Sequence, residues 1–243
     1  MKIKVVVPVT TKEFEIETRE EVKSLGFDIS KIDVEGIKYG TASIESRYDE
    51  LLCTPGIIKL CEKAQVEGYE GIFISCMFDP AVEAAREKLD IPVVGPCRTS
   101  MLLAADLAEK FSVVTVTESS IPLFYDIVRR VGIESKLASV RSVDIPVLEL
   151  ANKEKLKNAL VRVSIDTIEK DSAHCIILGC TGMMGVDRSL REELSKKGYN
   201  VPVIYPVSVA MRYLEMLISL GLFHSKKTYM YPSNKERNIW DVL

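Results

Sequence analysis

The sequence predicts an α/β protein of two pseudo-symmetric Rossmann-like halves, each a parallel sheet flanked by helices, with an active site in the crevice between them. Three observations lead to this fold class. Short β-branched runs alternate with amphipathic segments, and one order of elements occurs twice along the chain. The length of 243 residues is also enough for two small halves that share a groove.

The predicted strands are short and apolar on both faces. This pattern is typical of buried parallel strands, because strands with one solvated face alternate apolar and polar residues instead. The runs that fit are 4–7, 71–75, 91–94, 111–114, 175–178 and 201–204.

The predicted helices lie between these runs and combine a helical spacing of apolar residues with a charged outer face. The segments are 80–89, 100–110, 153–170, 188–197 and 207–220. Strand alternating with helix indicates a parallel sheet with helices on both sides.

The duplicated order is strand, cysteine, helix, strand, proline, helix. The first copy runs from Gly71 through Cys76 to Pro96, and the second from Cys175 through Cys180 to Pro206. We expect one half at 1–96 plus 207–243, carrying Cys76, and the other at 97–206, carrying Cys180. Each cysteine then lies at the carboxyl end of its strand, where open α/β sheets bind ligands, and the two thiols face each other.

Bulk properties exclude several functions. The net charge is only -3 with 28% charged residues, which gives no electrostatic reason to expect nucleic acid. No apolar run reaches the length of a membrane span, and charged residues come too early for a signal peptide, so we expect a cytoplasmic protein.

Two facing cysteines can invert a stereocentre. Inversion needs a base on one face of the carbon and an acid on the other, which one thiolate and one thiol can supply. Both cysteines precede predicted helices, so we expect helix N-termini and backbone N–H groups to lower their pKa. After Cys180, Thr181 and Gly182 form a small flexible pair whose backbone N–H groups can reach a substrate oxygen and stabilise an enolate.

The remaining cysteines fit a structural role, because cysteine often packs as a small hydrophobe. These are Cys53, Cys61, Cys97 and Cys175. None forms a CxxC pair suited to zinc, and the two histidines are too few for a His-rich site, so we expect no metal.

Several motifs resemble the hydantoin racemases of the aspartate/glutamate racemase superfamily. The family's GPxSIES and PG signatures are similar to the segments 40–46 and 55–56 of this chain. Its first cysteine block is similar to Cys76 together with the segments 79–80 and 84–87. The segments 91–95 and 111–115 are similar to its middle, 179–183 to its second cysteine block and 225–229 to its SKxxY-like end.

This resemblance implies a cofactor-free isomerase, a racemase that assembles into homo-oligomers and acts on a small molecule such as a 5-substituted hydantoin or allantoin. It assigns one enantiomer to Cys76 and the other to Cys180. The residues that it places around the substrate are Pro8, Val9, Thr10, Ser43, Met77, Phe78, Thr115, Thr117, Thr181, Gly182 and Met183. For Ser43 and the threonines, turn or capping chemistry is an equal alternative.

The chain departs from the family pattern at two places. An NPNT-like motif is replaced by Pro8-Val9-Thr10-Thr11, and bulky Met77 and Phe78 follow Cys76. Polar contacts are lost and apolar bulk is gained, which favours an apolar substituent or a substrate other than a hydantoin. The alternatives are an aspartate/glutamate-type racemase, a maleate isomerase or arylmalonate decarboxylase-like enzyme, and a small-molecule-binding or redox-sensing protein.

Overall fold

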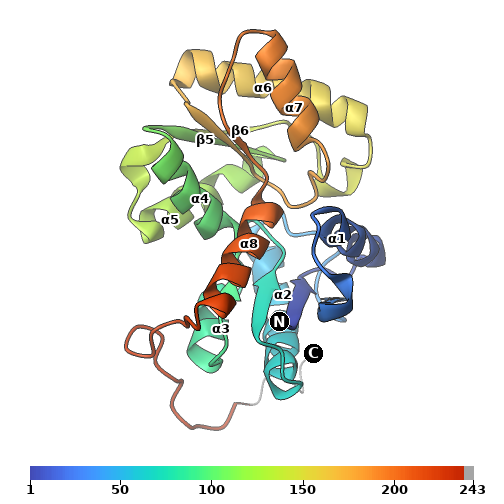
Figure 1. The fold of residues 1–243 in the computed structure, drawn as a ribbon, viewed down its shortest axis with the longest axis vertical. Coiled ribbons are helices and arrows are strands. Elements are labelled where there is room, and N and C mark those ends of the chain that lie inside the picture. Colours follow the sequence, from blue (N-terminus) through green and yellow to red (C-terminus); the bar gives the residue numbers. More distant parts are fainter. Residues whose placement is uncertain (238–243) are drawn as a thin grey trace.

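A computed structural model describes residues 1–237 and contains two parallel sheets of four strands each. The first has the order β2-β1-β3-β4 and the second the order β6-β5-β7-β8, so the same topology is used twice. Figure 1 shows the two sheets and their helices as two lobes, one above the other. The fold class predicted from the sequence is confirmed.

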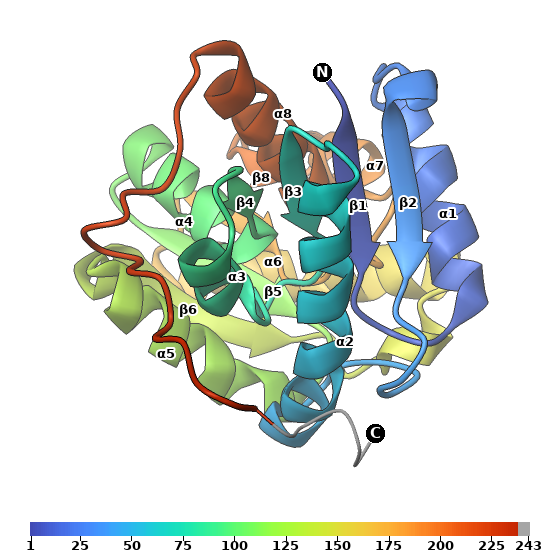
Figure 2. The ribbon, with the colours of Figure 1, turned by 90° about the horizontal axis from the view of Figure 1, so that it is seen from below.

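The first sheet is built from β1 (Ile3–Val7), β2 (Ile32–Gly36), β3 (Gly71–Ile74) and β4 (Val93–Val94). The helices that follow its strands are α1 (Lys12–Ser24), α2 (Arg47–Val66) and α3 (Val82–Lys88). A last helix, α8 (Pro206–Ser219), returns from the far end of the chain and packs on β3 and β4. Figure 2 shows α2 and α3 on one face of this sheet and α1 and α8 on the other.

The second sheet is built from β5 (Phe111–Thr115), β6 (Leu137–Ser142), β7 (Cys175–Leu178) and β8 (Val203–Ile204). Its helices are α4 (Pro96–Leu107), α5 (Ile121–Val131), α6 (Lys153–Asp171) and α7 (Asp187–Lys196). Four short 3-10 turns connect elements, at Ile29–Lys31, Glu118–Ser120, Glu134–Lys136 and Val147–Glu149.

The proline of each repeat begins a helix. Pro96 and Pro206 occupy the first turn of α4 and α8, where the missing N–H of proline costs nothing. These two helices pack against each other, with α4 on the second sheet and α8 on the first. The division into halves near Pro96 and Tyr205 stays a prediction, and residues 238–243 of its last range lie outside the described residues.

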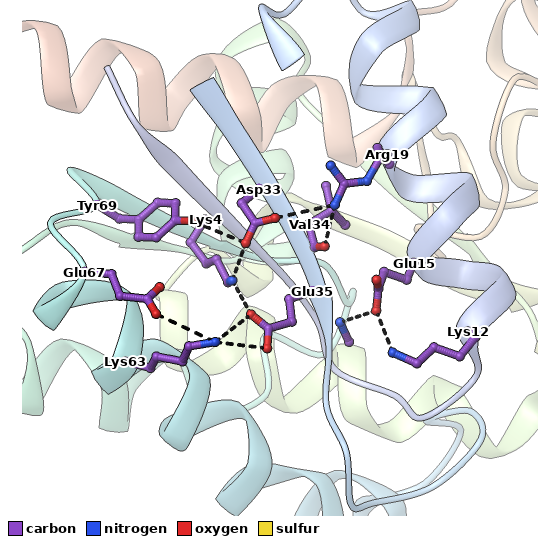
Figure 3. Close-up of polar contacts among 11 residues, drawn as sticks. Lys4, Lys12, Glu15, Arg19, Asp33, Val34, Glu35, Lys63, Glu67 and Tyr69 are labelled. Carbon is purple, nitrogen blue, oxygen red and sulfur yellow. Dashed lines mark hydrogen bonds and ion pairs between the residues drawn. The ribbon is translucent and has the colours of Figure 1, made fainter. Parts of the chain in front are cut away.

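The central strands are buried along their whole length, which explains why their sequences are continuously apolar. One exception is Lys4 on β1, whose side chain is only 1% exposed. Its ammonium contacts Asp33 and Glu35 of β2, and Lys63 of α2 reaches Glu35 from outside (Figure 3). Pairing with two carboxylates makes a buried charge tolerable in this position.

The C-terminal segment 224–231 crosses the first lobe and fastens α3. The Lys226 ammonium donates to the carbonyl oxygens of Arg86, Glu87 and Leu89, at 2.9, 3.1 and 2.6 Å. The Tyr229 hydroxyl accepts a hydrogen bond from the Arg86 guanidinium. The segment therefore caps the carboxyl end of α3, whose last carbonyls have no partner within the helix.

Candidate active site

Each of the two cysteines leaves its sheet through the same local geometry. The residue before it donates to the central strand, from Ser75 N to Val6 O at 2.9 Å and from Gly179 N to Val114 O at 2.8 Å. A turn then follows, from Asp79 N to Cys76 O at 3.0 Å and from Met183 N to Cys180 O at 3.2 Å. The repeat in the sequence is thus a repeat in hydrogen bonding.

The second strand end requires glycine. A Cβ atom on Gly179 would lie 2.8 Å from the Thr115 backbone, closer than side chains pack. The first copy has Ser75 at the matching place, so the two strand ends approach their neighbours differently.

Both cysteines line one pocket between the sheets, with an empty volume of about 590 Å³ including the part open to solvent. The other lining residues come from the ends of β1, β3 and β7 and from α1 and the loops after β2, β5, β6 and β7. They are Val7, Pro8, Val9, Phe14, Thr18, Ser43, Ile44, Ser75, Met77, Phe78, Val116, Val147, Gly179, Thr181, Gly182 and Met184.

Of the residues expected around the substrate, seven line this pocket: Pro8, Val9, Ser43, Met77, Phe78, Thr181 and Gly182. The remaining four are not in its lining. The hydroxyl of Thr10 donates to Thr41 O, and Thr115 and Met183 are fully buried. The Thr117 hydroxyl pairs with Ser119 and Ser120.

Other lining residues were not anticipated from the sequence. Phe14 and Thr18 lie on α1, and Ile44, Val147 and Met184 lie in loops. None of them carries a chemical signature, because an apolar side chain in a loop or on a helix looks the same whether it faces a core or a pocket. Their positions follow only from the tertiary structure.

The two cysteine loops are tied to each other across the pocket. The Thr181 hydroxyl donates to the carbonyl oxygen of Ser75 at 3.2 Å, which joins the residue after Cys180 to the residue before Cys76. The relative position of the two thiols therefore depends on a direct bond between the loops as well as on the packing of the sheets.

The expected lowering of the thiol pKa values is wrong. Burial, the largest cause, raises the pKa of Cys180 to about 11 and that of Cys76 well above its ordinary value. Backbone N–H groups of Gly182 and Phe78 act in the opposite direction but do not outweigh burial. The helices α3 and α7 also begin only at Val82 and Asp187, too far along to act directly on either sulfur.

The other thiols are buried: Cys53, Cys61, Cys97 and Cys175. Within residues 1–237, no group of three or more His, Cys, Asp or Glu side chains is arranged to hold a metal ion. In the same range, no helix is long and apolar enough to cross a membrane.

The fold and the pocket thus define an α/β protein with two thiols at matching strand ends of a duplicated domain. The family described as Asp/Glu/Hydantoin racemase matches residues 3–214, and the chain belongs to this family.

Similar proteins agree with this assignment. The hydantoin racemase of Pseudomonas sp. (strain NS671) is 37% identical over 97% of this chain and 94% of its own length. The hydantoin racemase of Rhizobium meliloti is 35% identical over 80% of this chain and 79% of its own. The structure of the allantoin racemase from Klebsiella pneumoniae superposes with a TM-score of 0.87 at 28% identity, covering 97% of this chain and 95% of that one.

Proposed function

We propose that the protein is a cofactor-independent racemase of a 5-substituted hydantoin or of allantoin, with Cys76 and Cys180 as its two proton-transfer groups. The observation that carries the proposal is that both cysteines line one pocket. The names of the similar hydantoin and allantoin racemases support the substrate class.

The reaction balances with the two thiols alone. The thiolate on one face removes the proton from the carbon next to a carbonyl, and the electron pair moves into an enolate. The thiol on the other face then delivers its own proton to that carbon, so the product has the opposite hand and the two sulfurs have exchanged protonation states. The reverse reaction begins from that exchanged state.

The chemistry of the pocket favours a neutral substrate. None of its lining residues, all within the described part of the chain, is charged. Aspartate, glutamate, maleate and arylmalonates all carry carboxylates, and a buried carboxylate without a cationic partner is costly. The hydroxyls of Thr18, Ser43 and Ser75 match instead the neutral amide groups of a hydantoin ring.

The apolar lining bears on the substituent of the ring. Phe14, Ile44, Val147 and Met184 offer carbon surface, which favours an alkyl or aryl group over the ureido group of allantoin. Cytoplasmic location and assembly into homo-oligomers remain predictions.

The test is incubation of single enantiomers of alkyl and aryl hydantoins, allantoin, aspartate and glutamate in deuterated water. We expect loss of optical rotation with deuterium incorporation for the hydantoins and none for the amino acids. Binding without either change would refute an enzymatic role, and loss of carbon dioxide would indicate a decarboxylase.

Single serine variants test the roles of the thiols. Cys76→Ser and Cys180→Ser should each abolish racemisation, because a serine hydroxyl is too weakly acidic to supply the base. Each variant should still exchange the proton of one enantiomer with solvent, and the favoured hand should differ between them. Exchange of the same enantiomer by both variants would contradict this division of roles.

A further inference from the structure

The peptide group between Thr181 and Gly182 is hydrogen-bonded at both of its ends. Its carbonyl oxygen accepts a hydrogen bond from the Tyr205 hydroxyl at 2.8 Å. Its N–H, on Gly182, donates to the sulfur of Cys180 at 3.3 Å. One planar amide therefore lies between a tyrosine outside the pocket lining and a thiol inside it.

Hydrogen bonds in such a chain strengthen one another. A donor at the carbonyl oxygen draws electrons through the conjugated amide, which makes the N–H at the other end a better donor. A better donor at a sulfur favours the thiolate over the thiol. The Tyr205 hydroxyl is thus placed to act on Cys180 without touching it.

We propose that Tyr205 is a positioning residue for Cys180, which stabilises the Cys180 thiolate through the Thr181–Gly182 peptide. This inference rests on the proposed function, in which Cys180 must ionise to act as a base. The N–H of Gly182 is among the groups that oppose the effect of burial on the Cys180 pKa, so its strength as a donor matters directly.

The surroundings keep Tyr205 a donor. The residue follows β8, is 5% exposed and lies immediately before the first turn of α8. Burial, with the charges of Glu21, Cys180 and Asp187, raises the pKa of its hydroxyl well above the ordinary value. The hydroxyl is therefore a proton donor at neutral pH.

Glu21 of α1 is the acid that faces this hydroxyl. It is 9% exposed, and its Oε2 has no hydrogen-bond partner. Its pKa is raised to about 7, mainly by burial, with Asp187 and Glu17 acting in the same direction and Tyr205 and Lys153 acting against it. A neutral Glu21 leaves the Tyr205 proton on Thr181, whereas an ionised Glu21 competes for it and weakens the relay.

The experiment measures the reactivity of the thiol rather than racemisation. Wild type and Tyr205→Phe are treated with iodoacetamide between pH 7 and 10, and alkylation of each cysteine is followed by peptide mass spectrometry. Tyr205→Phe should slow alkylation of Cys180 by about threefold to tenfold at each pH below its pKa, as expected for loss of one hydrogen bond. Cys76, read from the same samples, should not be slowed.

The matched control is Tyr199→Phe, which removes an exposed hydroxyl that bonds to Glu169. It should leave both cysteines unchanged. Unchanged alkylation of Cys180 in Tyr205→Phe, or equal slowing of Cys76, would overturn the proposal. A protein that shows the expected alkylation but racemises no hydantoin would refute the proposed function and leave the relay intact.

A second measurement uses the wild-type protein and does not depend on whether Tyr205→Phe folds. In wild type labelled with ¹⁵N-glycine, the Gly182 amide proton should move upfield between pH 6 and 8, as Glu21 ionises and draws the Tyr205 hydroxyl away. In Glu21→Gln the signal should stay in place over that range. A Gly182 signal that does not move in wild type refutes the part assigned to Glu21.

Discussion

Replacing the buried Lys4 tests how the first sheet is stabilised. In Lys4→Met the carbon chain and its packing are largely kept, while the ammonium is lost. Its two partners, Asp33 at 2.5 Å and Glu35, are then left without their strongest contact. The substitution therefore separates the charge of Lys4 from the burial of its methylene groups.

The expected loss is about 2 kcal/mol of unfolding free energy at pH 7. Removing one partner of a fully buried pair costs about 3–5 kcal/mol. The value is lower here because Asp33 and Glu35 are 40% and 26% exposed and keep Arg19, at 3.4 Å from Asp33, and Lys63, at 3.4 Å from Glu35. Solvent screens the carboxylates that remain.

The loss should depend on pH in a defined direction. Burial is the largest single influence and raises the pKa of Asp33 and Glu35, but Lys4 and the weaker neighbours of each carboxylate together outweigh it, so both pKa values lie below their ordinary values. Carboxyl groups with a lowered folded-state pKa stabilise the protein above their unfolded pKa of about 4, and this contribution is lost as the pH falls through the folded-state value. The difference between wild type and Lys4→Met should therefore be largest near neutrality and shrink toward pH 2.

Urea unfolding followed by circular dichroism at pH 7, 5 and 3 measures this difference. Lys63→Met is the matched control, since Lys63 lies on the outside of the same network with a half-exposed side chain, and it should cost less than about 0.5 kcal/mol. A loss in Lys4→Met below about 0.5 kcal/mol at pH 7, or one that does not change between pH 7 and pH 3, would refute this account of the network.

Three further predictions concern the two cysteine loops and the C-terminal segment. The rate of racemisation should rise from pH 7 to 9, by up to about tenfold per pH unit, because the raised pKa values of Cys76 and Cys180 leave only a small thiolate fraction at neutrality. A rate that falls over this range would contradict this prediction. Thr181→Val removes the hydrogen bond to Ser75 and should lower kcat several-fold, while the midpoint of thermal unfolding moves by only a few degrees. An unchanged kcat would show that this hydrogen bond between the loops does not position the thiols. Lys226→Met should cost about 1–2 kcal/mol in urea unfolding and the exposed Lys227→Met almost nothing, whereas equal losses would rule out capping of α3.

The sequence predicted the four inner strands and the short, buried edge strands β4 and β8, and it missed the edge strands β2 and β6 for a physical reason. The strands β1, β3, β5 and β7 are buried on both faces and appear as continuous apolar runs. The strands β2 and β6 lie at sheet edges and keep partly exposed residues such as Asp33 and Arg141. A search for uninterrupted apolar runs finds only strands that are covered on both sides.

The helix α2 was not predicted as an element, and it contains a proline. Pro55 would ordinarily be taken to end a helix, since it cannot donate to the preceding turn. Here the helix continues through Pro55 to Val66 and is packed on β1 and β3. Such tertiary support is not visible in a residue pattern.

The two thiols of the candidate site could be located from the sequence because each follows a recognisable strand. Their protonation could not be anticipated in the same way. Burial by distant residues, rather than the nearby helix, decides the direction of the pKa shifts of Cys76 and Cys180. Glu21 likewise resembles an ordinary charged residue of a surface helix until the fold places Tyr205 against it.

The two cysteine loops follow the same hydrogen-bonding plan but differ in their side chains, with Met77 and Phe78 after one thiol and Thr181 and Gly182 after the other. A racemase must obey an equilibrium constant of one between the two hands of its substrate, so kcat/KM has to be equal in both directions. Any unlike surroundings of the two thiols can then appear only as proportional differences in kcat and KM, which change in the same direction and cancel in their ratio. Under the proposed two-thiol mechanism, the imperfect duplication of the loops sets how each hand is bound and how fast it turns over, while thermodynamics fixes the ratio of kcat/KM between the hands.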